Sequence, residues 1–155
     1  MNLTDILSPK AIKVPLVARD KKAVIDELVD LLDDIGLIED PAALKQAVWE
    51  REQQRSTGIG DGLAIPHGKS NCTKNLVMAV GRPAEPIDFD SLDGKKVRLV
   101  VLLASPPQRI ADHIQALGKI SRMMSDPKFR QLAYAAESAE TLYRLFKEAE
   151  KPVVT

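Results

Sequence analysis

VRLVVLL, the stretch Val97–Leu103, is an almost continuously apolar run. A strand with water on one face alternates apolar and polar residues, whereas a strand that is covered on both faces has no such alternation. We therefore predict a central strand here. The turn residues Asp93-Gly94 precede this strand and Pro106-Pro107 end it, so both of its ends are marked.

Three shorter apolar runs predict the other strands. Leu76–Gly81 indicates a second full strand. Ile12–Val17 is consistent with a short strand, and Pro15 places it at a sheet edge, because proline cannot donate to a strand ladder. Leu63–Ile65 is a brief run that Pro66 interrupts.

Apolar residues at helical spacing predict helices around these strands. Asp20 is the expected N-cap of the first helix, and Gly36 closes it. Asp40-Pro41 starts the second helix. Three more are expected after the central strand, at residues 109–125, 127–136 and 139–150. The pattern predicts an α/β fold, a single domain with a mixed central β-sheet flanked by helices on both faces.

The composition excludes several classes of protein. The 155 residues include 22 Lys and Arg and 22 Asp and Glu, so the formal net charge is zero. Nucleic-acid binding and membrane-surface binding usually need a basic excess. Cys72 stands alone, no apolar run approaches a membrane span, and no signal peptide is visible. We expect one cytoplasmic domain over residues 1–155, without nucleic-acid binding or direct membrane insertion.

Residues 55–62 form a glycine-rich segment that predicts a loop. They hold too many glycines for a helix and show no strand alternation. No Gly-Lys-Ser/Thr follows, and Leu63 stands where a dinucleotide fingerprint needs its third glycine. Ser56 and Thr57 lack a nucleophile elbow and are expected to bond to loop backbone groups. Elsewhere, the pair Lys21-Lys22 is interpreted as solvated.

His67 is the first candidate functional residue. It follows Ile65-Pro66 and precedes Gly68, in a segment expected to be irregular. A histidine there does not fill a regular apolar face, and the glycines around it let backbone N–H groups approach an anion. Because functional residues concentrate on loops, a functional role is one interpretation. A surface histidine without a role is the other.

His113 and Arg51 are further candidates. At about 100° per residue, His113 points inward or to the edge of the apolar face of its helix. It is either a core histidine bonded to a backbone acceptor, or it faces His67 across a cleft and donates to an anion. Arg51 continues an apolar stripe, so it either snorkels over the helix end or binds an oxyanion such as phosphate. Two separated histidines without acidic neighbours at ligand spacing do not indicate a metal site.

The string Ser56–Lys69, STGIGDGLAIPHGK, resembles a known family. It is similar to the enzyme IIA domain of the bacterial phosphoenolpyruvate:sugar phosphotransferase system, fructose/mannitol type, and within it most similar to the free-standing nitrogen-regulatory enzyme IIA. The pair Arg51-Glu52 before the string and the helix with His113 after the apolar strand also match, so the resemblance covers residues 3–150. One departure is Ile114 after His113, where the family often has leucine.

The resemblance implies a site. His67 would be phosphorylated on Nε2, accepting the group from a phosphohistidine on HPr or its nitrogen-branch relative. His113 would be the second active-site histidine and Arg51 the neighbouring arginine. A neutral imidazole is the nucleophile that such a transfer needs, and positioned donors supply much of the catalysis. We expect no cofactor and no metal, because protein donors take the metal's role, and the transfer should resist a chelator. The residues expected to support the phosphate as a loop are Ser56, Thr57, Gly58, Gly60 and Gly68.

Three functions remain open at this point. A regulatory enzyme IIA binds target proteins according to its phosphorylation state, and the lack of an appended IIB or membrane domain in the sequence favours this interpretation. A sugar-specific enzyme IIA instead passes the group to an enzyme IIB. A binding module in which His67 is never phosphorylated is the third alternative, and the joint presence of His67, His113 and Arg51 argues against it. Phosphate on His67 would add negative charge that can switch partner choice.

Overall fold

The sheet at the centre of the protein is mixed, with the strand order β1-β5-β6-β3-β2 and β4 paired separately with β6. The structure is a computed structural model that describes residues 2–150. β1 runs parallel to β5, β5 antiparallel to β6, and β3 and β4 both run parallel to β6. The strands are β1 Ile12–Leu16, β2 Gly58–Gly60, β3 Leu63–Ala64, β4 His67–Lys69, β5 Val77–Pro83 and β6 Leu99–Ser105.

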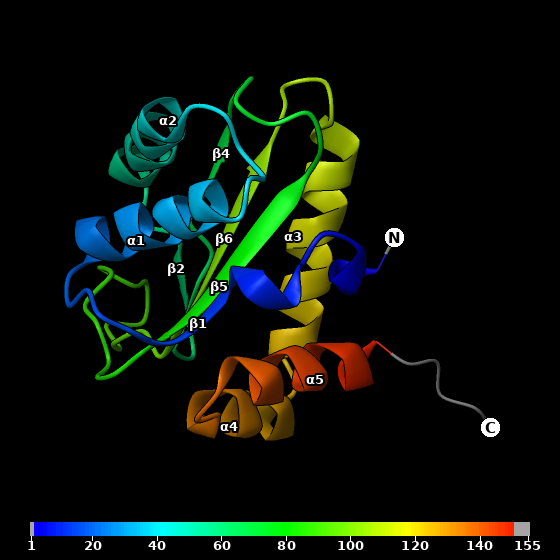
Figure 1. Cartoon of the computed structure of the whole chain (residues 1–155). Coiled ribbons are helices and arrows are strands. Elements are labelled where there is room, and N and C mark those ends of the chain that lie inside the picture. The colour runs from blue at the N-terminus through cyan, green and yellow to red at the C-terminus, as the bar shows by residue number, and fades with distance from the viewer. Residues whose placement is uncertain (1, 151–155) are drawn as a thin grey trace.

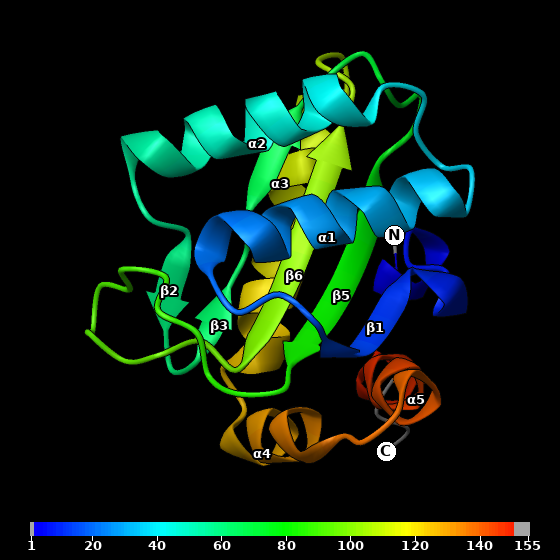
Figure 2. The same ribbon diagram turned by 60° about the vertical axis from the view of Figure 1, so that its left-hand side comes forward.

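Helices cover both faces of this sheet, as the sequence predicted. α1 (Lys21–Asp34) and α2 (Pro41–Gln54) cross one face, and α3 (Ile110–Met124) lies against the other (Figures 1 and 2). α4 (Pro127–Ala135) and α5 (Ala139–Ala149) lie together beyond one end of the strands (Figure 2). The 3₁₀ turns Leu3–Asp5 and Pro9–Ala11 precede β1. The α/β fold class is therefore confirmed.

Aspartate N-caps mark the starts of α1 and α2. The carboxylate of Asp20 accepts a hydrogen bond from the Ala23 N–H at 2.9 Å, and that of Asp40 accepts one from the Ala43 N–H at 3.0 Å. These caps satisfy backbone donors that have no partner within the helix. They confirm the predicted starts of α1 and α2.

β6 is the buried centre of the sheet. All seven of its residues are buried, since it has strands on both sides and helices over both faces. The strand begins and ends two residues later than the predicted Val97–Leu103. Val97 instead forms an isolated antiparallel bridge with Ile87, in which each N–H donates to the other residue's carbonyl. The apolar pattern correctly predicted the strand. It could not show that Val97 belongs to a separate bridge and not to the continuous ladder of β6.

The prediction of a loop at residues 55–62 is wrong. β2 lies within this segment and pairs antiparallel with β3 across a turn, in which Asp61 and Gly62 have positive φ values of 56° and 88°. His67, also expected in an irregular segment, is the first residue of β4. Strands of two or three residues are too short to show alternation, and their hydrogen-bond partners lie far along the chain.

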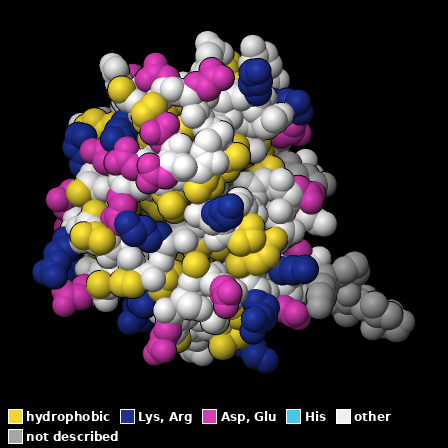
Figure 3. All heavy atoms as spheres, viewed as in Figure 1, with side chains coloured by type: hydrophobic (Ala, Val, Ile, Leu, Met, Phe, Trp, Pro, Cys, Tyr) yellow, Lys and Arg dark blue, Asp and Glu magenta, His cyan; other side chains and the backbone are white. Residues whose placement is uncertain are grey.

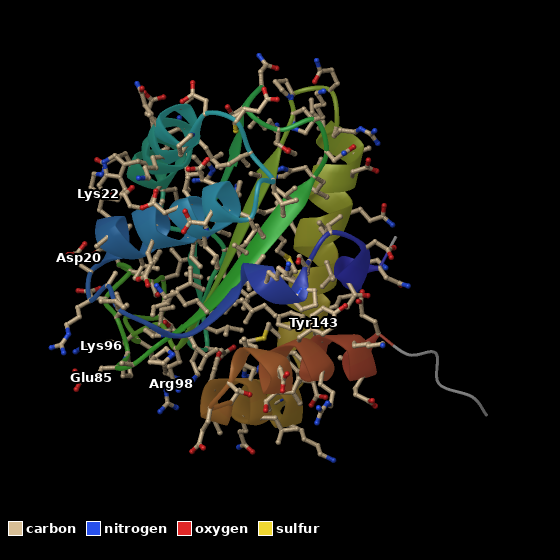
Figure 4. All side chains as sticks on the ribbon, viewed as in Figure 1. Asp20, Lys22, Glu85, Lys96, Arg98 and Tyr143 are labelled. Carbon is tan, nitrogen blue, oxygen red and sulfur yellow. The ribbon has the colours of Figure 1, made fainter. Side chains whose placement is uncertain are left out.

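The surface mixes charges of both signs. Lys and Arg side chains are interspersed with Asp and Glu on the face shown in Figure 3. Lys22, Lys96 and Arg98 point away from the body of the protein in Figure 4. Over residues 2–150, no helix has the length and apolar character needed to cross a membrane. Of the predicted span 1–155, residues 1 and 151–155 lie outside the described part.

Candidate functional site

A pocket of about 440 Å³ lies at one edge of β4, between α2 and α3. Arg51 of α2, His67, Gly68 and Lys69 of β4, and His113 of α3 contribute to its lining. The three main candidates from the sequence thus lie in one pocket, although they come from three elements. β6 is the one strand that β4 pairs with in the described chain, so its other edge is left for side chains of the two helices.

Gly68 brings α2 close to this strand. A Cβ atom at position 68 would lie 3.0 Å from Val48 Cγ2 and 3.1 Å from the Val48 backbone nitrogen. The helix backbone cannot yield at low cost, so a larger residue would push α2 away from β4. Arg51 follows Val48 by three residues and lies on the same side of the helix. The missing side chain of Gly68 therefore places Arg51 beside His67.

One ring nitrogen of His67, Nδ1, is hydrogen-bonded, and the other, Nε2, is available for a reaction. Its Nδ1 lies 2.7 Å from the Ile65 carbonyl oxygen. A carbonyl can only accept, so Nδ1 carries the hydrogen and the neutral ring keeps a lone pair on Nε2. Burial lowers the pKa of His67 below its ordinary 6.5, and the positive charges of Arg51 and Lys69 act in the same direction. The Ile65 bond and the Glu52 charge oppose this shift. At neutral pH, Nε2 is an unprotonated nucleophile.

His113 is a buried histidine that also faces His67. Its side chain is 3% exposed, and its ring centroid lies 5.3 Å from that of His67 at an interplanar angle of 66°. Burial, followed by the neighbouring His67 and Lys69, lowers its pKa to about 4. Nδ1 lies 2.6 Å from the Ser105 hydroxyl, so the partner of the ring is a side chain and not the expected backbone acceptor. His113 is thus both buried and turned toward His67, so a core position and a position facing His67 are not exclusive. Its donation to an anion stays a prediction.

Arg51 retains most of its hydrogen-bonding capacity. Its Nη1 donates to the Arg55 carbonyl at 2.9 Å, which ties the side chain to the end of α2. A guanidinium has five N–H donors, and this contact uses one of them. No ion pair to Arg51 is found among residues 2–150. The group is therefore positioned and charged, and it can bind a tetrahedral oxyanion in the pocket.

Four of the five residues predicted to support a phosphate do not line the pocket. The Ser56 hydroxyl donates to the Phe89 carbonyl and accepts from the Gly58 N–H at 3.0 Å. Thr57 is buried and bonded to α2 instead. The four residues are Ser56, Thr57, Gly58 and Gly60. Their hydrogen bonds hold β2 in place, and Gly68 alone of the predicted group reaches the pocket.

Glu52 is an important residue that the sequence analysis left without a role. It is 2% exposed, and its carboxylate accepts hydrogen bonds from Thr57 N–H at 2.9 Å and from the Thr57 hydroxyl. Lys21 Nζ lies 3.0 Å from the same carboxylate. The interpretation of Lys21 as solvated is therefore wrong, because a buried carboxylate needs a cation. This cluster joins α1 and α2 to Thr57, the residue before β2, and it contains the residue that follows Arg51 in the chain.

Two signals in the sequence could have found these residues. Glu52 follows Leu44 and Val48 at intervals of four, so it stands in the buried stripe of α2, where an unpaired charge is costly. Lys69 follows His67 by two residues and lies on the same face once β4 is known to be a strand. Residues 2–150 contain no group of three or more His, Cys, Asp or Glu side chains that could hold a metal ion.

Comparisons with known proteins show the family of the chain. The family model for the phosphoenolpyruvate-dependent sugar phosphotransferase system, EIIA 2, matches residues 5–149. The chain is 34% identical to a nitrogen regulatory protein of Bradyrhizobium diazoefficiens, covering 92% of this chain and 93% of that one. It is also 34% identical to a fructose-specific EIIA component of Haloferax volcanii, covering 96% and 98%. A fructose-specific EIIABC component of Bacillus subtilis is 35% identical, and the match covers 97% of this chain but 24% of that longer protein.

Solved structures show the same fold. The nitrogen regulatory protein IIA-Ntr from Neisseria meningitidis superposes with a TM-score of 0.85 at 30% identity, covering 93% of this chain and 98% of that chain. The mannitol enzyme IIA of Escherichia coli, solved in complex with phosphorylated enzyme IIB, gives a TM-score of 0.78 at 19% identity and covers 91% and 96%. The chain belongs to the EIIA type 2 family of the phosphoenolpyruvate-dependent sugar phosphotransferase system and has the phosphoryl-transfer role of that family.

Proposed function

We propose that His67 carries the phosphoryl group on Nε2, that it receives this group from a phosphohistidine on an HPr-type carrier, and that the protein acts in regulation in the cytoplasm. One observation carries the proposal. The Ile65 carbonyl occupies Nδ1 at 2.7 Å, which leaves Nε2 as the nucleophile in the pocket that Arg51 and His113 also line. A surface histidine without a role needs no such arrangement.

The transfer is an in-line exchange between two ring nitrogens. The Nε2 lone pair of His67 attacks phosphorus, the new N–P bond forms, and the N–P bond to the donor histidine breaks with its electron pair returning to the donor ring. Nδ1–H keeps its bond to the Ile65 carbonyl and holds the ring in place. The lowered pKa of His67 keeps the nucleophile unprotonated at neutral pH.

Positive charge and N–H donors around Nε2 stabilise the transferred group. Its negative charge is spread over three oxygens in the transition state, so fixed donors at those positions accelerate the reaction. Arg51 supplies a charged fork, Lys69 a second positive charge, and His113 a neutral ring N–H. Burial of His113 and half-burial of His67 strengthen these interactions by excluding water.

Intact mass measures the carrier role directly. Wild type and His67→Ala are incubated with phosphoenolpyruvate, enzyme I and HPr, or with the nitrogen-branch relative of HPr, at neutral to alkaline pH. We expect one phosphoryl group on wild type and none on His67→Ala, with the same far-UV circular dichroism. Purified phospho-HPr with a chelator should phosphorylate wild type equally well. Stable phosphate on His67→Ala refutes the assignment, and no phosphate on wild type with either carrier favours the binding-module function.

The sugar-specific function is the second candidate. The chain is as similar to a free-standing fructose-specific EIIA component as to a nitrogen regulatory protein, at 34% identity each. The two functions differ in what removes the phosphoryl group. Phosphorylated protein is mixed with a fructose-type enzyme IIB, and its mass is followed. Retention of phosphate supports regulation, whereas rapid loss to enzyme IIB supports sugar uptake.

A further inference from the structure

Ser105 places a hydroxyl group directly behind the second histidine. It is the last residue of β6, it is fully buried, and its Oγ lies 2.6 Å from His113 Nδ1. The Ser70 N–H donates to its backbone carbonyl at 2.9 Å, and its neighbour in the β4 ladder is Lys69. Its backbone is therefore held on the side that faces β4, and its side chain lies on the same face of the sheet as His67.

Hydrogen-bond satisfaction decides which of the two groups is the donor. Within residues 2–150, His113 Nδ1 is the one partner of the Ser105 hydroxyl, and no buried side-chain polar atom is left without a partner. If Nδ1 carried a hydrogen, it would donate to Oγ, and the hydroxyl hydrogen of this fully buried residue would then have no acceptor among residues 2–150. If the hydroxyl donates to Nδ1, both groups are satisfied. Nδ1 therefore holds the lone pair, and the ring hydrogen is on Nε2.

We propose that Ser105 is a positioning residue, whose hydroxyl fixes His113 in the tautomer with hydrogen on Nε2, so that His113 donates to the phosphoryl group on His67. This inference rests on the proposed function. The two histidines are then held in opposite tautomers by two different neighbours. The Ile65 carbonyl leaves His67 with a nucleophilic Nε2, and the Ser105 hydroxyl leaves His113 with a donating Nε2–H.

The tautomer matters because His113 is uncharged. Its pKa of about 4 keeps the ring neutral at physiological pH, so the ring has one hydrogen to donate. A hydrogen on Nε2 stabilises phosphoryl oxygens, whereas a lone pair at the same place repels them. Without the hydroxyl, the neutral ring distributes between both tautomers and presents the repelling form for part of the time.

Two variants of equal shape isolate the hydroxyl. Ser105→Thr adds one methyl group, and Ser105→Val has a second methyl group in place of the hydroxyl, so the two variants have nearly the same shape. Both suit a strand, but only threonine can donate to Nδ1. Nitrogen-15 NMR of the imidazole rings at neutral pH is the first readout, and it needs no phosphorylation. We expect wild type and Ser105→Thr to show hydrogen on Nε2 of His113, and Ser105→Val to show a mixture. An unchanged tautomer in Ser105→Val overturns the proposal. Ser105→Ala is the alternative if neither β-branched variant folds.

Transfer from phospho-HPr is the second readout. Ser105→Val should slow phosphorylation of His67 by about twofold for an even mixture of tautomers, because only the fraction of His113 with hydrogen on Nε2 donates to the phosphoryl group, while Ser105→Thr stays close to wild type. In a His113→Ala background, Ser105→Val should cause no further loss, since it acts through His113. Equal slowing in both backgrounds overturns the positioning role. Absence of phosphate on wild type overturns the proposed function, and the NMR result then stands separately.

Discussion

Acidification should destabilise the folded protein through His113. Its pKa falls from 6.5 to about 4 on folding, chiefly because burial disfavours the charged ring. As pH falls below 6.5, the unfolded chain takes up a proton that the folded protein takes up only near pH 4, so stability is lost across this window. Each pKa unit corresponds to about 1.36 kcal/mol. The free energy of unfolding should therefore drop by about 2 kcal/mol between pH 7 and pH 5, and by about 3 kcal/mol over the full shift.

Urea unfolding of wild type and His113→Gln at pH 7 and pH 5 tests this magnitude. Glutamine keeps a polar group beside Ser105 but does not titrate, so wild type should lose about 2 kcal/mol more than the variant over this interval. His67 is present in both proteins, and its lowered pKa contributes to both in the same direction. Identical pH dependence of the two proteins would refute the buried, neutral state of His113.

Three further predictions concern the surroundings of His67. The Arg51→Lys variant should fold normally but accept the phosphoryl group about tenfold more slowly, because an ammonium group cannot replace the bidentate guanidinium fork. A rate equal to wild type in the phospho-HPr assay excludes Arg51 from the site. Glu52→Ala should lower the free energy of unfolding in urea by about 3 kcal/mol, because it removes the buried partner of Lys21 and leaves the Thr57 N–H and hydroxyl without their acceptor. Asp90→Asn, which removes an exposed charge 3.4 Å from Lys21 and suits the positive φ at this position, should cost less than about 1 kcal/mol. Gly68→Ala should destabilise by about 1–3 kcal/mol in the same assay and slow the transfer, since the added Cβ moves α2; unchanged stability and rate contradict the close approach.

Much of the fold could be predicted from local patterns. The apolar stretch Val97–Leu103 predicted a central covered strand, and the caps Asp20 and Asp40 marked the starts of two helices. These features depend on neighbours within a few residues of the chain. Strands β2, β3 and β4 could not be predicted in the same way, because each has two or three residues and is a strand only by pairing with distant segments.

The candidate site could likewise be predicted from the sequence only in part. The sequence by itself determined the family and indicated His67, His113 and Arg51 as candidate site residues, because the string around His67 is long and specific. Only the tertiary structure decided that these three line one pocket, and that four of the five expected phosphate-supporting residues do not.

Tertiary contacts also decided the chemical state of each group. Three contacts join groups from separate elements: Ser105 with His113, Glu52 with Lys21, and Gly68 with the backbone of α2. A serine, a lysine or a glycine has the same letter in the sequence whether it is solvated or buried against such a partner. Burial and hydrogen bonding set the tautomer, the charge and the position of the reacting groups, and both arise only when the sheet brings distant segments together.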